Sequence, residues 1–178
     1  MDLWEKDYRP ELTAVLKELR AALRAEGFRT RGRELHREHP ELTWIVKPER
    51  LFGGSKVAIR FGVFLPDLQA GPVTLLHCGL GGDYNHLGNG TPPSPPSIRF
   101  EDRAGILGAA LDFRSPCSVQ ERIAVMRVVA SDLGLTASRV STRADVRDLL
   151  EAPGARLWFV SLRFRELLRH PEPPPNAD

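Results

Sequence analysis

The stretch "KVAIRFGVFLP", residues 56–66, decides the fold class. Its large apolar residues alternate strictly with their neighbours, a pattern typical of a strand with one face in a core. These residues are Val57, Ile59, Phe61, Val63 and Leu65. Pro66 ends the strand, because proline has no N–H to give to a central ladder.

Three further stretches with a period of two lie around this strand. They are "FRTRGRELHRE" at 28–38, "ELTWIVKPERLF" at 41–52 and "GPVTLLHCGLG" at 71–81. The turn "GGS" at 53–55 and other short connections separate them. Four successive strands with short turns predict an antiparallel meander. We expect "SIRFED", residues 97–102, to add a short edge strand.

Helical patterns precede and follow the predicted sheet. The stretch "PELTAVLKELRAALRAEGF", residues 10–28, carries one apolar stripe, with Pro10 in the first turn and Gly27 at the end. A capping box of Ser118 and Glu121 predicts a second helix that ends at Gly134, and another predicted cap begins at Thr142.

These elements predict an α+β fold. An antiparallel β-meander of four to five strands packs on the N-terminal helix, and two or more helices follow. The chain has 178 residues, which favours a single domain over 1–170. The proline-rich end, 171–178, predicts a disordered tail. Residues 155–170 are compatible with either a strand or a helix.

Composition narrows the possible functions. The formal net charge is only +2, which argues against a protein that coats polyanions with its whole surface. The two cysteines do not form a disulfide framework, and the charged N-terminus has no apolar signal region. Apolar runs of membrane-spanning length do not occur. We therefore expect a cytoplasmic protein that is not in a membrane.

A row of arginines is the first candidate binding surface. If residues 28–38 form one strand, the arginines of odd number share a face, and a neighbouring strand adds one more. The row consists of Arg29, Arg31, Arg33, Arg37 and Arg60. Such a row can hold phosphates while Trp44 stacks on a base. The alternative is a solvated outer face screened by nearby glutamates, with Trp44 in the core.

The stretch "LLHCGLGGDYNHLGNGTPPSPPS", residues 75–97, is the second candidate. A nucleophilic site here would use Cys78, with His86 as base and Asp83 to orient it. No helix opens after the glycines to complete a phosphate site, and the spacing matches no common zinc pattern. We expect a glycine-rich turn with Cys78 as a small buried residue, and we predict no catalytic residue, no metal and no cofactor.

The first half of the chain also resembles a known family. The residues concerned are "LKELRAALRAEGFRTRGRELHRE" at 16–38, "LTWIVKPERLFGGSKVAIRFGVFLPDL" at 42–68 and "LLHCGLGGDY" at 75–84. Over residues 10–85 they resemble the bacterial domain-of-unknown-function family numbered four-three-zero-four. The resemblance implies a bacterial, cytoplasmic α+β domain and no transferable catalytic residues. By analogy, families of this type serve as small binding or immunity-like proteins beside toxins.

The sequence thus favours a non-enzymatic binding or interaction module with another protein as its partner. An immunity-like role is one form of this function. The first alternative is a nucleic-acid-binding protein that uses the arginine-lined sheet face. The second is a small hydrolase or metal-dependent enzyme built around Cys78 and His86.

Overall fold

The computed structural model describes residues 7–66, 72–84, 100–151, 159–161 and 164–166. Its helices are α1 (Arg9–Ala25), α2 (Phe100–Leu111), α3 (Val119–Arg139) and α4 (Arg143–Glu151). Its strands are β1 (Arg29–Arg31), β2 (Glu34–Glu38), β3 (Thr43–Leu51), β4 (Lys56–Phe64), β5 (Leu80–Asp83) and β6 (Phe159–Val160). Two short 3₁₀ helices, η1 (Phe52–Gly54) and η3 (Leu75–His77), complete the described elements.

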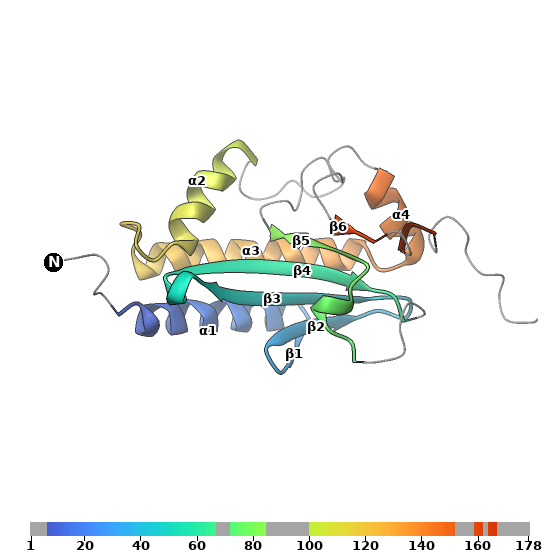
Figure 1. Ribbon diagram of the computed structural model, residues 1–178, viewed down its shortest axis with the longest axis horizontal. Coiled ribbons are helices and arrows are strands. Elements are labelled where there is room, and N and C mark those ends of the chain that lie inside the picture. Colours follow the sequence, from blue (N-terminus) through green and yellow to red (C-terminus); the bar gives the residue numbers. More distant parts are fainter. Residues whose placement is uncertain (1–6, 67–71, 85–99, 152–158, 162–163, 167–178) are drawn as a thin grey trace, which may run out of the picture.

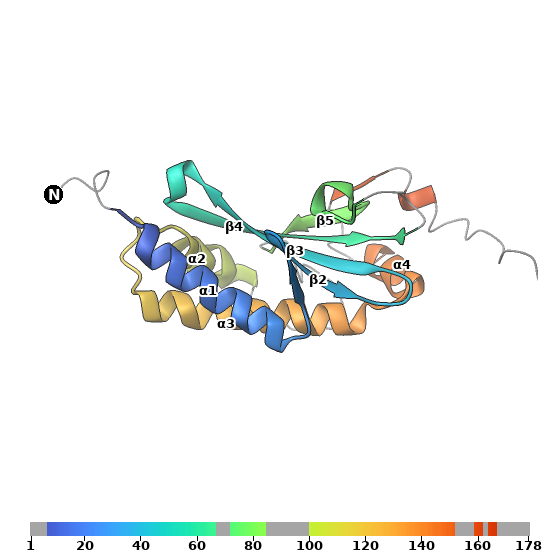
Figure 2. The ribbon, with the colours of Figure 1, turned by 90° about the horizontal axis from the view of Figure 1, so that it is seen from below.

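The six strands form one antiparallel sheet in the order β1-β2-β3-β4-β5-β6 (Figure 1). This confirms the predicted α+β meander, with more strands than the four to five expected. Helices α1 and α3 pack against each other and against one face of the sheet, here named the inner face (Figure 2). The tail at 171–178 lies outside the described residues.

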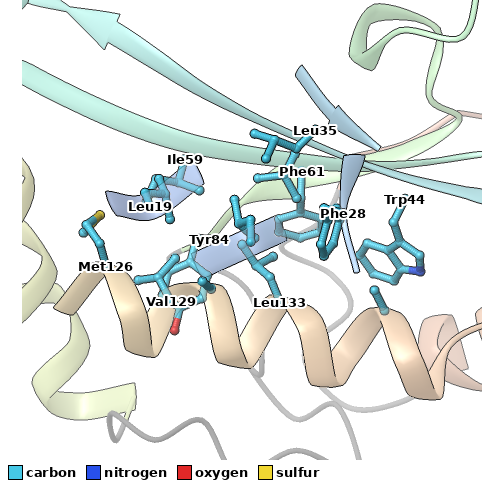
Figure 3. Close-up of a cluster of buried hydrophobic side chains, with 14 of the residues drawn as sticks. Leu19, Phe28, Leu35, Trp44, Ile59, Phe61, Tyr84, Met126, Val129 and Leu133 are labelled. Carbon is cyan, nitrogen blue, oxygen red and sulfur yellow. The ribbon is translucent and has the colours of Figure 1, made fainter. Parts of the chain in front are cut away.

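The longest strand pair, β3 with β4, sets the inner face. Nine residue pairs join the two strands, from Thr43 opposite Phe64 to Leu51 opposite Lys56. The alternating residues predicted from "KVAIRFGVFLP" point inward and are buried, as are Trp44 and Val46 of β3. Figure 3 shows Ile59, Phe61 and Trp44 of this face beside Leu19 of α1 and residues of α3. The main core is therefore the layer between the sheet and the two long helices, and a second, small cluster lies on the other face of the sheet.

Helix α1 ends as its sequence predicts. Gly27 has a φ of +88°, and its N–H donates to Arg24 O while Phe28 N–H donates to Leu23 O. These two bonds form a Schellman motif, which requires a residue that tolerates the left-handed conformation. The motif turns the chain directly from α1 into β1.

Helix α3 begins at the predicted capping box of Ser118 and Glu121 but does not end at Gly134. The helix continues to Arg139, so that prediction was wrong. A Cβ at Gly134 would lie 2.5–2.7 Å from atoms of the Glu26 side chain. Glycine is present because the end of α1 approaches α3 closely here, and helix termination plays no part.

The connection between α2 and α3 is organised by one buried arginine. Arg122 is 1% exposed, and its guanidinium lies 4.4 Å from the ring centroid of Phe113. The guanidinium donates to backbone carbonyls of the preceding turn at 2.7–3.1 Å. The accepting residues are Ala109, Ala110, Asp112, Ser115 and Cys117. Arg122 thus satisfies carbonyls that the C-terminus of α2 leaves open.

Three other local predictions meet different outcomes. Asp145 accepts from Ser141 N and Thr142 N, which confirms the cap before α4. The fourth strand predicted at 71–81 was wrong over 75–77, where the chain forms η3, and pairing begins only at Leu80. Phe100 opens a helix, so the predicted edge strand at 97–102 does not form over its described part.

At the C-terminal end, Phe159–Val160 pairs with β5 and 164–166 are helical. Both readings of 155–170 are therefore represented in its described part. None of the described helices is both long enough and apolar enough to cross a membrane.

Candidate functional site: a basic groove between α1 and β3

The predicted arginine row is broken by a hairpin. Gly32 has a φ of +61°, and the two-residue turn of Gly32 and Arg33 joins β1 to β2. Arg29 and Arg31 lie opposite His36 and Glu34 and share the outer sheet face with them. Because two residues form the turn, residues of even number in β2 lie on the face that odd-numbered residues occupy in β1.

Arg37 consequently points to the inner face, and the prediction that it continues the row was wrong. Its guanidinium donates to Glu26 O at 2.9 Å and to Gly134 O at 3.0 Å. These bonds tie the C-terminus of α1 to α3. Arg37 therefore holds the two helices together on the inner side of the sheet.

Trp44 and Arg60 do not join an arginine surface either. Trp44 is 0% exposed, and its Nε1 donates to Val140 O at 2.8 Å, so the ring is not available for stacking. Arg60 is exposed on the outer face of β4 and forms an ion pair of 3.1 Å with Glu49. Arg31 is likewise paired, with Glu38. The outer face thus carries separate ion pairs in place of a positive row.

Cys78 is a packing residue. It is 9% exposed and packs with Ile45 and Phe64 on the outer face of the sheet. Burial, with a smaller contribution from Glu34, raises the pKa of its thiol far above the usual range. A thiol held protonated is a poor nucleophile.

The other members of the predicted loop site do not gather around Cys78. His77 Nδ1 contacts Thr74 Oγ1 at 2.9 Å, and Asp83 lies in β5 opposite Arg60. His86 lies outside the described residues. Over the described ranges, no group of three or more His, Cys, Asp or Glu side chains is placed to hold a metal ion.

A different surface gathers cationic side chains. A groove of about 940 Å³ lies between one face of α1, the hairpin tip and the second half of β3. Ten residues line it, and six of them are Lys or Arg while one is a carboxylate. The cationic residues are Lys17, Arg20, Arg24, Arg33, Lys47 and Arg50. Six cations and one carboxylate give the lining a formal charge of +5 (6 − 1), against a net +2 for the whole chain.

Helical spacing explains the α1 side of the groove. Thr13, Lys17, Arg20 and Arg24 follow one another at intervals of three or four residues, so they form one stripe along the helix. The stripe borders the apolar stripe that faces the core, and Leu16 belongs to both surfaces. The three cations therefore face the groove together.

Most of these cations have no carboxylate partner. Within the described residues, no Asp or Glu oxygen lies within ion-pair distance of Lys17, Arg20, Arg24, Arg33 or Arg50. The Nε atom of Arg20 is buried and has no hydrogen-bond partner among the described residues. An unsatisfied buried donor is costly to the folded protein.

The one carboxylate in the groove is already engaged. Glu49 Oε1 lies 2.9 Å from Lys47 Nζ, and its Oε2 lies 3.1 Å from Arg60 on the outer face. Glu49 therefore compensates Lys47 and leaves the α1 side of the groove uncompensated. The arrangement can hold an extended anion.

Sequence reasoning missed this groove, although one signal for it was present. Lys17, Arg20 and Arg24 stand at helical spacing beside the apolar stripe of α1. Only the fold brings them close to Lys47 and Arg50, which lie in β3, a strand that pairs with β4. Arg33 is the single member of the predicted row that lines the groove.

Comparison with known proteins adds no family. No protein-family model, no curated protein and no solved structure matches this chain. The resemblance of residues 10–85 to a bacterial family stays a prediction.

Proposed function

We propose that this protein is a non-enzymatic binding protein whose groove between α1 and β3 holds an acidic segment of a partner protein. The observation that carries the proposal is the convergence of six cationic side chains on one groove with a single, already paired carboxylate. Anionic ligands are favoured there by charge and by the charge-assisted hydrogen bonds that Lys and Arg donate. An immunity-like role, with a toxin as the partner, is one form of this function.

Nucleic acid is the alternative ligand for a basic groove. Single-strand binders combine cations with aromatic side chains on which bases stack. The residues lining this groove include no aromatic side chain in the described part of the chain, and Trp44 is enclosed in the core. The geometry therefore favours an acidic peptide, and an oligonucleotide serves as the competing probe.

The enzyme alternative has little support. Cys78 is buried, and its Sγ lies 3.7 Å from Thr74 O. The nearby Glu34 carboxylate is already engaged by His36 and by Leu75 N, and together with burial it raises the pKa of the thiol, which opposes a nucleophilic role. The groove has cations but no paired acid and base of the kind that general acid–base catalysis needs.

Binding of two labelled probes tests the proposal. We would measure fluorescence anisotropy with a ten-residue peptide that alternates Glu and Thr, and with a ten-nucleotide oligothymidylate. The groove variant carries Lys17→Gln, Arg20→Gln and Arg24→Gln. The control carries Arg29→Gln, Arg31→Gln and Arg165→Gln, which removes the same charge from exposed positions outside the groove.

The peptide should bind the wild type and the control alike. It should bind the groove variant at least about tenfold more weakly, because the loss of one charge-assisted hydrogen bond is enough to lower the affinity about tenfold. Equal peptide affinity in the groove variant would overturn it. Stronger binding of oligothymidylate, lost in the groove variant, would replace the acidic peptide with nucleic acid as the ligand.

A further inference from the structure

The second half of β3 has a neighbour on only one side. Strand β2 pairs only with the first four residues of β3, from Glu38 opposite Thr43 to Leu35 opposite Val46. Strand β4 pairs with β3 along its whole length, to Leu51. Within the described part of the chain, Lys47–Leu51 therefore has an open edge where β2 has ended (Figure 2).

The open edge coincides with the groove. Four consecutive residues of β3, Lys47 to Arg50, line the groove, and α1 forms the facing wall. Groove residues extend along α1 from Thr13 to Arg24, a span of about 16 Å at the helical rise. The strand residues from Lys47 to Leu51 span about 13 Å. The open edge thus fits an extended segment of about five residues, and the wall formed by α1 covers that whole length.

The residues along this edge discriminate between possible strands. Pro48 removes one N–H, and Lys47 and Arg50 place positive charge beside the edge. Proline and charge are devices by which proteins prevent sheet edges from pairing indiscriminately. Apolar or basic strands, including the basic β3 edge of a second copy, are disfavoured. An acidic strand gains from the same charges.

We propose that the acidic partner segment binds as an additional strand on the open edge of β3, from Lys47 to Leu51. This inference rests on the proposed function and adds the mode of binding. Backbone hydrogen bonds to β3 supply the pairing, as in other cases of strand addition. Acidic side chains on alternate positions then face Lys17, Arg20 and Arg24 on α1, while the intervening side chains face away.

Backbone methylation of the probe distinguishes strand pairing from attraction by charge alone. The parent probe is the ten-residue peptide of alternating Glu and Thr. One derivative carries N-methyl groups on the Glu amides and a second carries them on the Thr amides, so both keep the charge of the parent. Affinities of all three are measured by anisotropy with the wild type and with the Lys17→Gln, Arg20→Gln, Arg24→Gln variant.

Strand addition predicts an asymmetric result, because alternate amides of a strand point to opposite edges. One methylated peptide loses roughly two or three backbone hydrogen bonds and binds about tenfold more weakly, while the other binds like the parent. If both derivatives bind like the parent and all depend on the groove cations, strand addition is overturned and the proposed function stands. If the parent peptide binds without dependence on the groove cations, both fall.

Discussion

Replacing Arg20 by Met should stabilise this protein while weakening its binding of an acidic peptide. The Nε atom of Arg20 is buried without a partner among the described residues, and Lys17 and Arg24 lie three and four positions away on the same helix face. Methionine keeps an unbranched stem and has nearly the same helix propensity as arginine. The substitution therefore removes the charged head while preserving most of the packing.

The magnitude follows from these contacts. Relieving one buried unsatisfied donor contributes about 1 kcal/mol, at the low end of the usual range because Arg20 is only partly buried. Relieving two like-charge pairs on the helix adds about 0.2–0.5 kcal/mol each. The free energy of unfolding should rise by about 1–2 kcal/mol, which corresponds to an increase in Tm of about 2–8 °C for a domain of this size.

Thermal unfolding at low ionic strength, followed by circular dichroism, measures this effect. Arg24→Met is the matched control, since Arg24 is exposed and loses only one like-charge neighbour. Its Tm should stay within about 1–2 °C of the wild type. A Tm for Arg20→Met that falls below the wild type would refute the reasoning, because it would mean that the Arg20 guanidinium stabilises the free protein.

Three further predictions concern the fold and the second candidate site. Arg122→Met should lower the free energy of unfolding by about 3 kcal/mol in urea denaturation, because it removes the guanidinium donor of five backbone carbonyls, three of which also accept from Ser115 or Cys117. In native protein at pH 8, iodoacetamide should alkylate Cys117 and spare Cys78, whose thiol pKa is raised by burial; mass spectrometry that finds Cys78 modified first would contradict its structural role. Hydrogen bonds from Arg114, and then Lys56, lower the pKa of Asp112, so its stabilisation is present above its unfolded pKa of about 3.9 and is lost as pH falls further. Asp112→Asn should therefore lose less stability than the wild type between pH 4 and pH 2.

The sequence predicted those elements whose signal is local. Strict alternation in β4 identified the inner face because the side-chain period of a strand is two, and the end of α1 followed from Gly27 and Phe28. The capping box of Ser118 and Glu121 is equally local. In each case the residues that decide the structure lie in one short continuous stretch of the chain.

Elements that depend on distant neighbours were predicted less well. Gly134 has the composition of a helix end, but it is needed because Glu26 packs on it from α1. Arg37 belongs to an alternating run, yet the turn at Gly32 moves it to the other face. Period-two alternation cannot distinguish one long strand from a hairpin with a two-residue turn.

The groove depends on the same kind of distant information. Its α1 stripe is visible in the sequence, but the opposite wall exists only because β2 ends before β3 does. That mismatch in strand length sets Lys47 and Arg50 across from Lys17 and Arg20. A basic stripe on a helix is usually solvated, and only the facing cations make this one a candidate site.

The most direct test of the central claim is a map of backbone amide chemical shifts as the alternating Glu–Thr peptide is added to ¹⁵N-labelled protein. Binding in the groove predicts the largest changes along Thr13–Arg24 of α1 and at the amides of Lys47 and Glu49–Leu51 of β3, since Pro48 has no N–H, with Arg29 and Arg31 on the outer face unaffected. Changes concentrated on the outer face or around Cys78, with α1 and β3 unchanged, would show that the groove is not the binding site.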